Sequence, residues 1–264
     1  MAILALIFAA AVGAAAPQAA APAPVIQRIP AQEARQGVAS DGRYVYAIAN
    51  NAIGKYDKAT GRKVAGWTGD RQLFPHINSC TMVEEKLVCA ASNYPAVPQA
   101  SSVEFFDPAT MTHVGSRSLG PGTGSLTVMM RHDNSWWGVF ANYDAKGGEP
   151  GRDHRYTTLV RMNDQFQREE AWLFPEDVLA RFAPSSCSGA AWGPDNRLYV
   201  TGHDRRELYV LELPKAGGRL AHVETIAIAT GGQAIDWDGA QAGVLWSIER
   251  GQGEMVASRI RPAE

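Results

Sequence analysis

The chain has 264 residues, a formal net charge of −2, and 25 Lys and Arg residues against 27 Asp and Glu residues. This balance excludes a protein dedicated to nucleic acids, which would carry a basic excess, and a hydrophobic content of 45% excludes a disordered chain. Gly and Pro are frequent, at 26 and 15 residues, which favours many short strands joined by turns. We therefore expect a single soluble β-rich domain.

The first 24 residues differ in composition from the rest of the chain. Residues 2–16 are apolar and uncharged, and Ala, Pro and Gln spacers continue to Pro24. This apolar run is shorter than the roughly 20 residues of a membrane span but suits a secretory signal. We expect a signal peptide and spacer over residues 1–24, with cleavage near Ala14 or Ala15 and a periplasmic or secreted mature protein. An uncleaved N-terminal anchor is the alternative.

A unit of four short strands recurs five times along the rest of the chain. The copies start near Gln36, Asn78, Gly124, Ser188 and Gln233. Antiparallel units at about 40–50 residues per repeat are typical of propeller blades, and seven of them would need about 280 residues. The sequence therefore predicts an all-β, five-bladed β-propeller over residues 25–264.

The two ends of the chain predict how the ring closes. The fifth copy stops after the segment EMVASRI at residues 254–260 without a fourth strand, whereas VIQRIP at residues 25–30 precedes the first copy. We expect this N-terminal segment to complete the last blade, which removes exposed strand edges. The best helix pattern, PEDVLARF at residues 175–182, falls between the third and fourth copies, where the separation is longest.

Short turns and long connections fall on opposite faces of the predicted ring. Turns such as SDG at residues 40–42 and GPDN at residues 193–196 join strands on one face, which we call the bottom. The connections that lengthen all belong to the other face, the top; they are residues 68–77, 94–100, 143–156 and 173–187. Insertions confined to one face of a repeat ring mark that face as the binding side.

Two of the three cysteines face each other in the predicted second blade. A turn at residues 84–85 places Cys80 opposite Cys89, within reach of a disulfide that an exported protein could form. Two buried thiols fit the same pattern, so both states remain open. Cys187 is unpaired in either case.

Polar residues recur at equivalent positions of the five copies, where two rings meet at the top mouth of the central channel. The first strands contribute Gln36, Asn78, Gly124, Ser188 and Gln233, and the second strands contribute Asn50, Asn93, Asn142, Asp204 and Arg250. A packed core should not repeat such groups, because burying an unpaired polar group is costly. They either contact a ligand or bond to loop backbone and water. The candidate substrate-binding residues are Arg250, Gln36, Asn78, Asn93, Asn142, Ser188 and Gln233.

Three histidines belong to top-face segments: His76, His154 and His203. They could converge on a divalent metal such as zinc, although their spacing has no metal-ligand signature. Acid–base work is the better use, because imidazole titrates near neutral pH. The catalytic candidates are therefore His203 and His154, with Asp204 and Glu249 beside the inner ring, and the sequence requires no cofactor.

Arginines gather on the top side of this slightly acidic chain. They are Arg152, Arg155, Arg205, Arg206 and Arg250. Because arginine captures carboxylates and phosphates with two parallel hydrogen bonds, Arg250 in the inner ring is the strongest candidate to bind an anion. We expect the partner to be a small anionic organic molecule, with no nucleic acid and no membrane beyond the leader, and the protein to be a monomer.

Several stretches are similar to a known family: RQGVASDGRYVYAIAN, RHDNSWWGVFANYD, SSCSGAAWGPDNRLYVTGHD and GQAIDWD. As a set they resemble small secreted bacterial β-propellers that are often labelled cycloisomerases, over nearly the whole chain after residue 30. The opening QG of the first copy is also similar to the five-bladed glutaminyl cyclases. The resemblance implies the propeller fold and an isomerase-like or lyase-like activity.

The sequence thus predicts an exported, cycloisomerase-like or cyclase-like propeller enzyme that acts on a small carboxylate-bearing metabolite by acid–base catalysis at the top of its channel. Two alternatives remain open: a non-catalytic propeller that binds a ligand or a protein, and a lactone or ester hydrolase. A buried polar pocket favours the enzyme, and a flat apolar top face favours the binder. A metal held by the three top-face histidines would favour the hydrolase.

Overall fold

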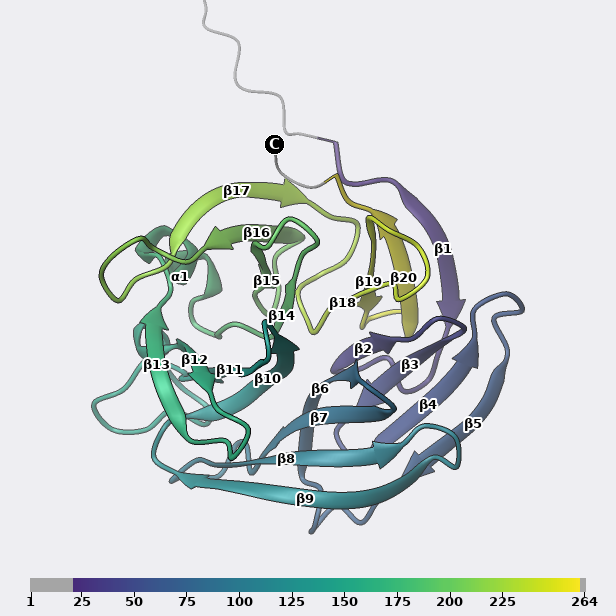
Figure 1. Ribbon diagram of the computed structural model, residues 1–264, viewed down its shortest axis with the longest axis horizontal. Helices are drawn as coiled ribbons and strands as arrows, with labels where there is room; N and C mark the ends of the chain where they lie inside the picture. The colour runs from purple at the N-terminus through teal and green to yellow at the C-terminus, as the bar shows by residue number, and fades with distance from the viewer. Residues whose placement is uncertain (1–20, 262–264) are drawn as a thin grey trace, which may run out of the picture.

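Five four-stranded antiparallel sheets form a ring in the computed structural model, which describes residues 21–261 (Figure 1). The predicted all-β, five-bladed propeller is therefore confirmed. Of the expected leader, residues 1–20 lie outside the described residues. Within residues 21–261, no helix is long and apolar enough to cross a membrane.

In four of the blades the strands follow one another in the chain from the centre of the ring outwards (Figure 1). The first two blades are β2 (Gly37–Ser40), β3 (Tyr44–Ala49), β4 (Ala52–Asp57) and β5 (Lys63–Thr68), then β6 (His76–Val83), β7 (Lys86–Ser92), β8 (Ala100–Asp107) and β9 (Thr112–Pro121). The next two are β10 (Ser125–His132), β11 (Ser135–Ala141), β12 (Thr158–Met162) and β13 (Arg168–Leu173), then β14 (Gly189–Trp192), β15 (Leu198–Thr201), β16 (Glu207–Glu212) and β17 (Ala221–Ala227).

Burial along a blade follows the strand's distance from the centre. The second strand of the first blade, β3, reads YVYAIA and is buried over most of its length, because neighbouring blades cover both of its faces. The outermost strand β5 reads KVAGWT and alternates between exposed and half-buried residues. Hydrophobic residues thus pack between blades, while an outermost strand such as β5 exposes one of its two faces to solvent.

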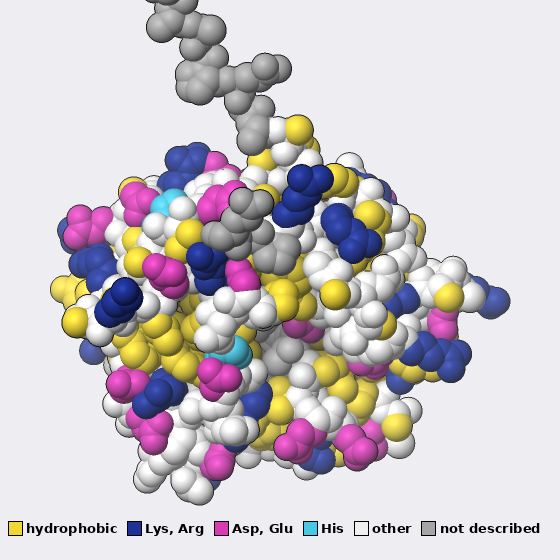
Figure 2. Space-filling view, turned by 45° about the horizontal axis from the view of Figure 1, so that its top comes forward, with side chains coloured by type: hydrophobic (Ala, Val, Ile, Leu, Met, Phe, Trp, Pro, Cys, Tyr) yellow, Lys and Arg dark blue, Asp and Glu magenta, His cyan; other side chains and the backbone are white. Residues whose placement is uncertain are grey.

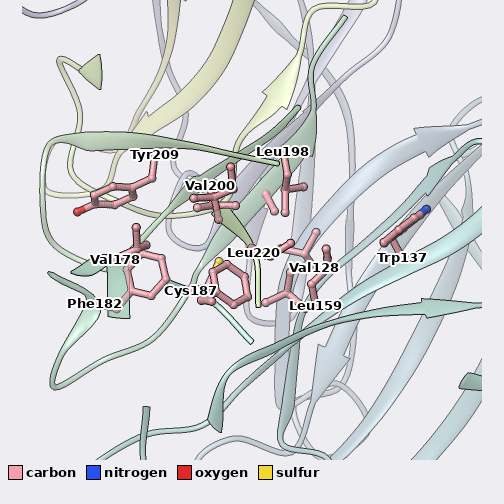
Figure 3. Packing of buried hydrophobic residues seen from close by; sticks show 14 of the residues in the cluster. Val128, Trp137, Leu159, Val178, Phe182, Cys187, Leu198, Val200, Tyr209 and Leu220 are labelled. Atoms are coloured by element: carbon pink, nitrogen blue, oxygen red, sulfur yellow. The ribbon is translucent and has the colours of Figure 1, made fainter. Parts of the chain in front are cut away.

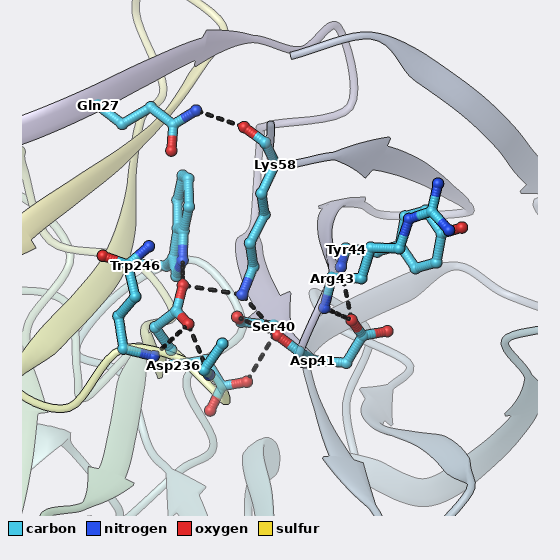
Figure 4. A network of polar contacts seen from close by, with 11 residues as sticks. Gln27, Ser40, Asp41, Arg43, Tyr44, Lys58, Asp236 and Trp246 are labelled. Carbon is cyan, nitrogen blue, oxygen red and sulfur yellow. Dashed lines mark hydrogen bonds and ion pairs between the residues drawn. The ribbon is translucent and has the colours of Figure 1, made fainter. Parts of the chain in front are cut away.

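The fifth blade is closed by the N-terminal strand, as the sequence predicts. It consists of β18 (Asp236–Trp237), β19 (Val244–Glu249), β20 (Glu254–Arg259) and β1 (Val25–Pro30), and β1 pairs antiparallel with β20. The first and last blades are also joined at Lys58, whose ammonium lies 2.8 Å from the buried Asp238 carboxylate and whose carbonyl accepts a 2.6 Å hydrogen bond from Gln27 (Figure 4).

One helix occupies the longest connection between blades. The predicted helix at residues 175–182 is confirmed as α1 (Glu176–Phe182), and a short 3-10 helix spans His154–Tyr156. Val178 and Phe182 of α1 are buried against Tyr209 and Cys187 between the third and fourth blades (Figure 3). The thiol of Cys187 is therefore a core group, and burial raises its pKa, which argues against a nucleophilic role.

A disulfide joins Cys80 and Cys89 across β6 and β7. Of the two states that the sequence leaves open, a disulfide and two buried thiols, the structure has the disulfide.

On the face shown in Figure 2, basic and acidic side chains are interspersed, as expected from the small net charge.

Candidate functional site

A cavity of about 500 Å³ opens on the top face, and every blade contributes to its walls. Its volume falls in the range of small-molecule sites. Strand ends supply Gln36, Asn50, His76, Asn78, Thr127, Ser188, His203, Gln233 and Arg250, and the top-face loops supply Pro75, Tyr94, Pro95, Tyr143, Ala145, Lys146, Pro184 and Ser185. The top face is therefore hollowed by a polar pocket.

Two β-bulges at equivalent positions turn polar side chains into this cavity. The register between β6 and β7 shifts between Ile77 and Ser79, and Asn78 lies at the shift. In the next blade the register between β10 and β11 shifts around Thr127 in the same way. Because a bulge leaves one residue unpaired and re-aims its side chain, each first strand can pack its apolar residues between blades and still offer a polar group to the cavity.

A close approach of two backbones joins the fourth and fifth blades at the cavity wall. A side chain at Gly232 would lie 2.0 Å from the carbonyl oxygen of Gly202, so only glycine fits there. The residues that follow these glycines are His203 and Gln233, and the Gln233 amide donates a 3.4 Å hydrogen bond to the His203 carbonyl. The glycine contact therefore places two cavity-lining residues side by side.

The charges around the cavity are all positive. Arg250 and Lys146 line it, and no Asp or Glu side chain of residues 21–261 does. Neither cation forms an ion pair with any residue in the described range 21–261. Two cations without a counter-charge in one concave polar site create a potential that attracts an anion.

His203 connects one of these cations to a carboxylate outside the cavity. Its Nδ1 lies 2.6 Å from Asp204 Oδ1, and its Nε2 lies 3.3 Å from Nη1 of Arg250. A guanidinium can only donate, so Nε2 accepts a hydrogen bond and the ring proton resides on Nδ1, which donates to Asp204. This tautomer leaves a lone pair facing the cavity side of the ring.

An aromatic wall stands on the side of the second and third blades. The ring centroids of His76 and Tyr94 are 5.0 Å apart, and those of Tyr94 and Tyr143 are 4.9 Å apart. Burial lowers the pKa of His76 to about 4, against a hydrogen bond with Asn78 that raises it. His76 is therefore neutral at pH 7, and burial also raises the pKa values of both tyrosines, so this wall carries no charge.

The structure brings part of the predicted set together. Of the predicted substrate-binding and catalytic residues, those that line the cavity are Gln36, Asn78, Ser188, His203, Gln233 and Arg250. His76, which the sequence offers as a metal ligand, lines it as well. Asp204 does not line the cavity but orients His203 from behind.

Four predicted site residues lie outside the cavity, because they form hydrogen bonds or ion pairs with neighbouring loops and side chains. Asn93 holds its own turn, donating to the Pro98 carbonyl and accepting from the backbone of Ala100. Asn142 is buried and donates to the carbonyl of Tyr156.

The other two residues outside the cavity are an acid and a histidine. Glu249 forms an ion pair with Arg206 at 2.8 Å. Nδ1 of His154 lies 2.6 Å from Asp144 in the loop between β11 and β12. His154 therefore lies outside the lining of the cavity that His203 lines, and its predicted part in proton transfer stays a prediction.

The three predicted metal-binding histidines do not form a joint ligand set. Among residues 21–261, the group whose ligand atoms lie within 4.8 Å of one another consists of Asp144, Asp153 and His154. Within it, His154 is bonded to Asp144, and Asp153 forms an ion pair with Arg155. These contacts explain the cluster as a loop structure, and the zinc site expected at His76, His154 and His203 is not assembled.

Among the cavity residues that were missed from the sequence are Tyr94, Tyr143 and Lys146. They belong to loops of unequal length, which have no common repeat register. One signal was nevertheless present. The dipeptide Asn-Tyr directly follows the second strand of two consecutive blades, at residues 93–94 and 142–143, and its tyrosines meet in the aromatic wall.

Comparisons with protein-family models and with curated proteins give no match. Among solved structures, hydrazine synthase of Kuenenia stuttgartiensis is similar at a TM-score of 0.48 and 12% identity, over 86% of this chain and 71% of that chain. A chain of a mitotic checkpoint complex reaches 0.47 at 10% identity, over 98% and 99% of the two chains. The β-propeller domain of Cps50 (Swd1) from Myceliophteria thermophila reaches 0.45 at 11% identity, over 85% and 83%. Such distant likenesses say nothing of function, and the resemblance to a family labelled cycloisomerase stays a prediction.

Proposed function

We propose that the top cavity binds a small carboxylate-bearing metabolite and that His203 transfers a proton within it. One observation carries the proposal. Arg250 and Lys146 both line a cavity that no carboxylate of residues 21–261 lines, and neither cation forms an ion pair within that range. Arg250 would hold the carboxylate with charge-assisted hydrogen bonds, and the amides of Gln36, Asn78 and Gln233 would orient the rest of the molecule.

The proton transfer follows from the tautomer of His203. A ligand carboxylate at Arg250 draws the guanidinium away from Nε2, which frees the Nε2 lone pair to take a proton from the ligand. The imidazolium that forms is stabilised by Asp204 at Nδ1. Return of the proton to a different atom of the ligand completes an isomerisation or ring closure without loss or gain of atoms. His76 is neutral at pH 7 and serves as a polar wall in this scheme.

The geometry favours this enzyme over the two alternatives. The top face is hollow, polar and cationic, which suits the binding of a small anion. A protein-binding propeller would instead present a flat apolar surface. A metal-dependent hydrolase has no support from the three histidines, whose ligand atoms do not gather at one point.

We also propose that the protein works outside the cytosol, in the periplasm or the medium. The disulfide between Cys80 and Cys89 supports this location, because such bonds persist in oxidising compartments. The apolar residues 2–16 support export as well.

Binding is tested by screening small organic acids for a thermal shift and titrating the best of them by calorimetry. Arg250→Gln should weaken the best acid about tenfold or more, the loss of one strong ion pair. Arg62→Gln is the matched control, because Arg62 is an exposed arginine in a turn between β4 and β5, outside the cavity lining. Equal affinity of the wild type and Arg250→Gln would contradict the proposal.

Catalysis is tested by following the bound acid by NMR over time. His203→Ala should reduce turnover about a hundredfold or more, since a positioned acid–base group contributes that much. His222→Gln, which changes a histidine on the outer strand β17, should turn over at the wild-type rate. Retained turnover in a folded His203→Ala variant would overturn the catalytic role.

A further inference from the structure

A second hollow of about 440 Å³ adjoins the top cavity. It shares Gln36, Asn50, Pro75 and Arg250 with the cavity, so the two hollows have a common wall. Its other walls are formed by Arg35, Arg71, Ala49 and Asn51. We call this second hollow the side groove.

Three arginines line the side groove, and no Asp or Glu does. Within residues 21–261, none of Arg35, Arg71 and Arg250 forms an ion pair. The acidic residues nearest to these arginines in the chain have other partners. Glu33 pairs with Lys63, Glu249 pairs with Arg206, and Oδ1 of Asp70 accepts a 2.7 Å hydrogen bond from the backbone of Gln72.

Arg35 is held in place by the backbone. Its Nη1 donates a 2.9 Å hydrogen bond to the carbonyl of Arg250, and its Nε donates to the carbonyl of Gln32 at 3.3 Å. The guanidinium therefore has a fixed position, and its Nη2 has no acceptor among the described residues. Arg71 approaches from the exposed turn between β5 and β6, and its side chain forms no hydrogen bond or ion pair within residues 21–261. A fixed guanidinium beside a free one suits an oxyanion, which two guanidinium groups can bind together.

We propose that the side groove is a subsite for a second oxyanionic group of the same ligand. This inference rests on the proposed function, because it requires that the first carboxylate is bound at Arg250 and Lys146. Arg250 stands at the junction of the two hollows, so a ligand bound through it can extend its other end toward Arg35 and Arg71. The substrate class is therefore an elongated acid with two anionic groups, and the second group is a carboxylate or a phosphate-type oxyanion.

The test is calorimetric titration of matched acids at low salt. Glutarate, adipate and pimelate carry two carboxylates, butyrate and hexanoate carry one, and 4-phosphonobutyrate carries a phosphonate in place of the second carboxylate. The wild type should bind the best doubly charged acid about tenfold tighter than the matched monocarboxylate. The tighter binder of glutarate and 4-phosphonobutyrate, which have the same three methylenes between their acid groups, identifies the kind of second group.

The variant Arg35→Gln/Arg71→Gln should reduce this tenfold preference to less than about twofold, while the control Arg62→Gln keeps it. A preference that survives in the double variant, or no preference in the wild type, would overturn the subsite while leaving the first proposal standing. The first proposal fails separately if monocarboxylates bind without any dependence on Arg250. Absence of binding by every acid would contradict both.

Discussion

At the scale of single residues, local contacts decide what each histidine can do. His203 is oriented by Asp204 on one side and Arg250 on the other, with an accepting nitrogen toward the cavity. His154 has a similar carboxylate partner in Asp144 but lies outside the cavity. His76 lines the cavity, yet burial keeps it neutral. Residue type alone could not separate these three roles, because they depend on loop folds and on partners distant in the chain, such as Arg250, which is 47 residues from His203.

The buried His76 and the half-buried Asp236 should give opposite pH dependences of stability. The pKa of His76 is about 4 in the folded protein, below its ordinary 6.5, because burial disfavours the charged ring. The unfolded chain thus binds more protons between pH 4 and 6.5, and His76 contributes about 3 kcal/mol of stability above pH 6.5 that is lost as pH falls to 4. Burial raises the pKa of Asp236 from 3.8 to about 7, so its contribution is lost as pH rises through 7.

Urea unfolding at pH 4.5, 5.5 and 6.5 measures these slopes. Relative to the wild type, His76→Gln should make the unfolding free energy fall more steeply, or rise less, as pH increases. Asp236→Asn should have the opposite effect. Parallel profiles for all three proteins would show that neither side chain titrates differently in the folded and unfolded states.

At the scale of elements, the strand ends and bulges place the cavity residues. The repeat register predicted Gln36, Asn78, Ser188 and Gln233, because each begins or precedes a first strand that faces the centre. It failed at Gly124, where Thr127 lines the cavity instead after a bulge. Because β10 is buried at six consecutive positions, its residues show no clear alternation from which a one-residue register shift could be predicted.

The hairpin of β6 and β7 carries the disulfide, which closes a short loop in the unfolded chain. Replacing both Cys80 and Cys89 by Ala should lower the free energy of unfolding by about 2–3 kcal/mol, the entropy of closing a loop of this size. Denaturant unfolding measures the loss. Reduction with dithiothreitol should lower the free energy of unfolding of the wild type to that of the variant. It should leave the free energy of unfolding of the variant unchanged. Equal stability of the two oxidised proteins would contradict this contribution.

At the scale of the whole molecule, the ring is closed by pairing the two ends of the described chain. Strand β1 pairs with β20, and the contacts of Lys58 with Gln27 and Asp238 join the first blade to the last (Figure 4). The unmatched segment at residues 25–30 predicted this closure, and the repeat period predicted the number of blades. The loops on the top face were predicted as a binding side, but their folds were not, since each loop is set by contacts such as those of Asn93 and Asn142.

Removal of the closing strand should therefore affect the entire ring. A chain that begins at residue 31 leaves the edge of β20 unpaired, which should lower the thermal unfolding temperature and promote association. A chain that begins at residue 21 keeps β1 and should unfold like the longer protein. Thermal unfolding followed by size-exclusion chromatography compares them. A monomeric, equally stable protein starting at residue 31 would show that β1 is dispensable.

We propose that the cavity recognises negative charge through Arg250 and Lys146. The most direct test of this claim is calorimetric titration of the best-binding acid and of its carboxamide, which has nearly the same shape but no charge. The acid should bind the wild type at least about tenfold tighter than the amide. In the variant Arg250→Gln/Lys146→Gln the two should bind with similar affinity. Equal affinities of acid and amide for the wild type would contradict the claim.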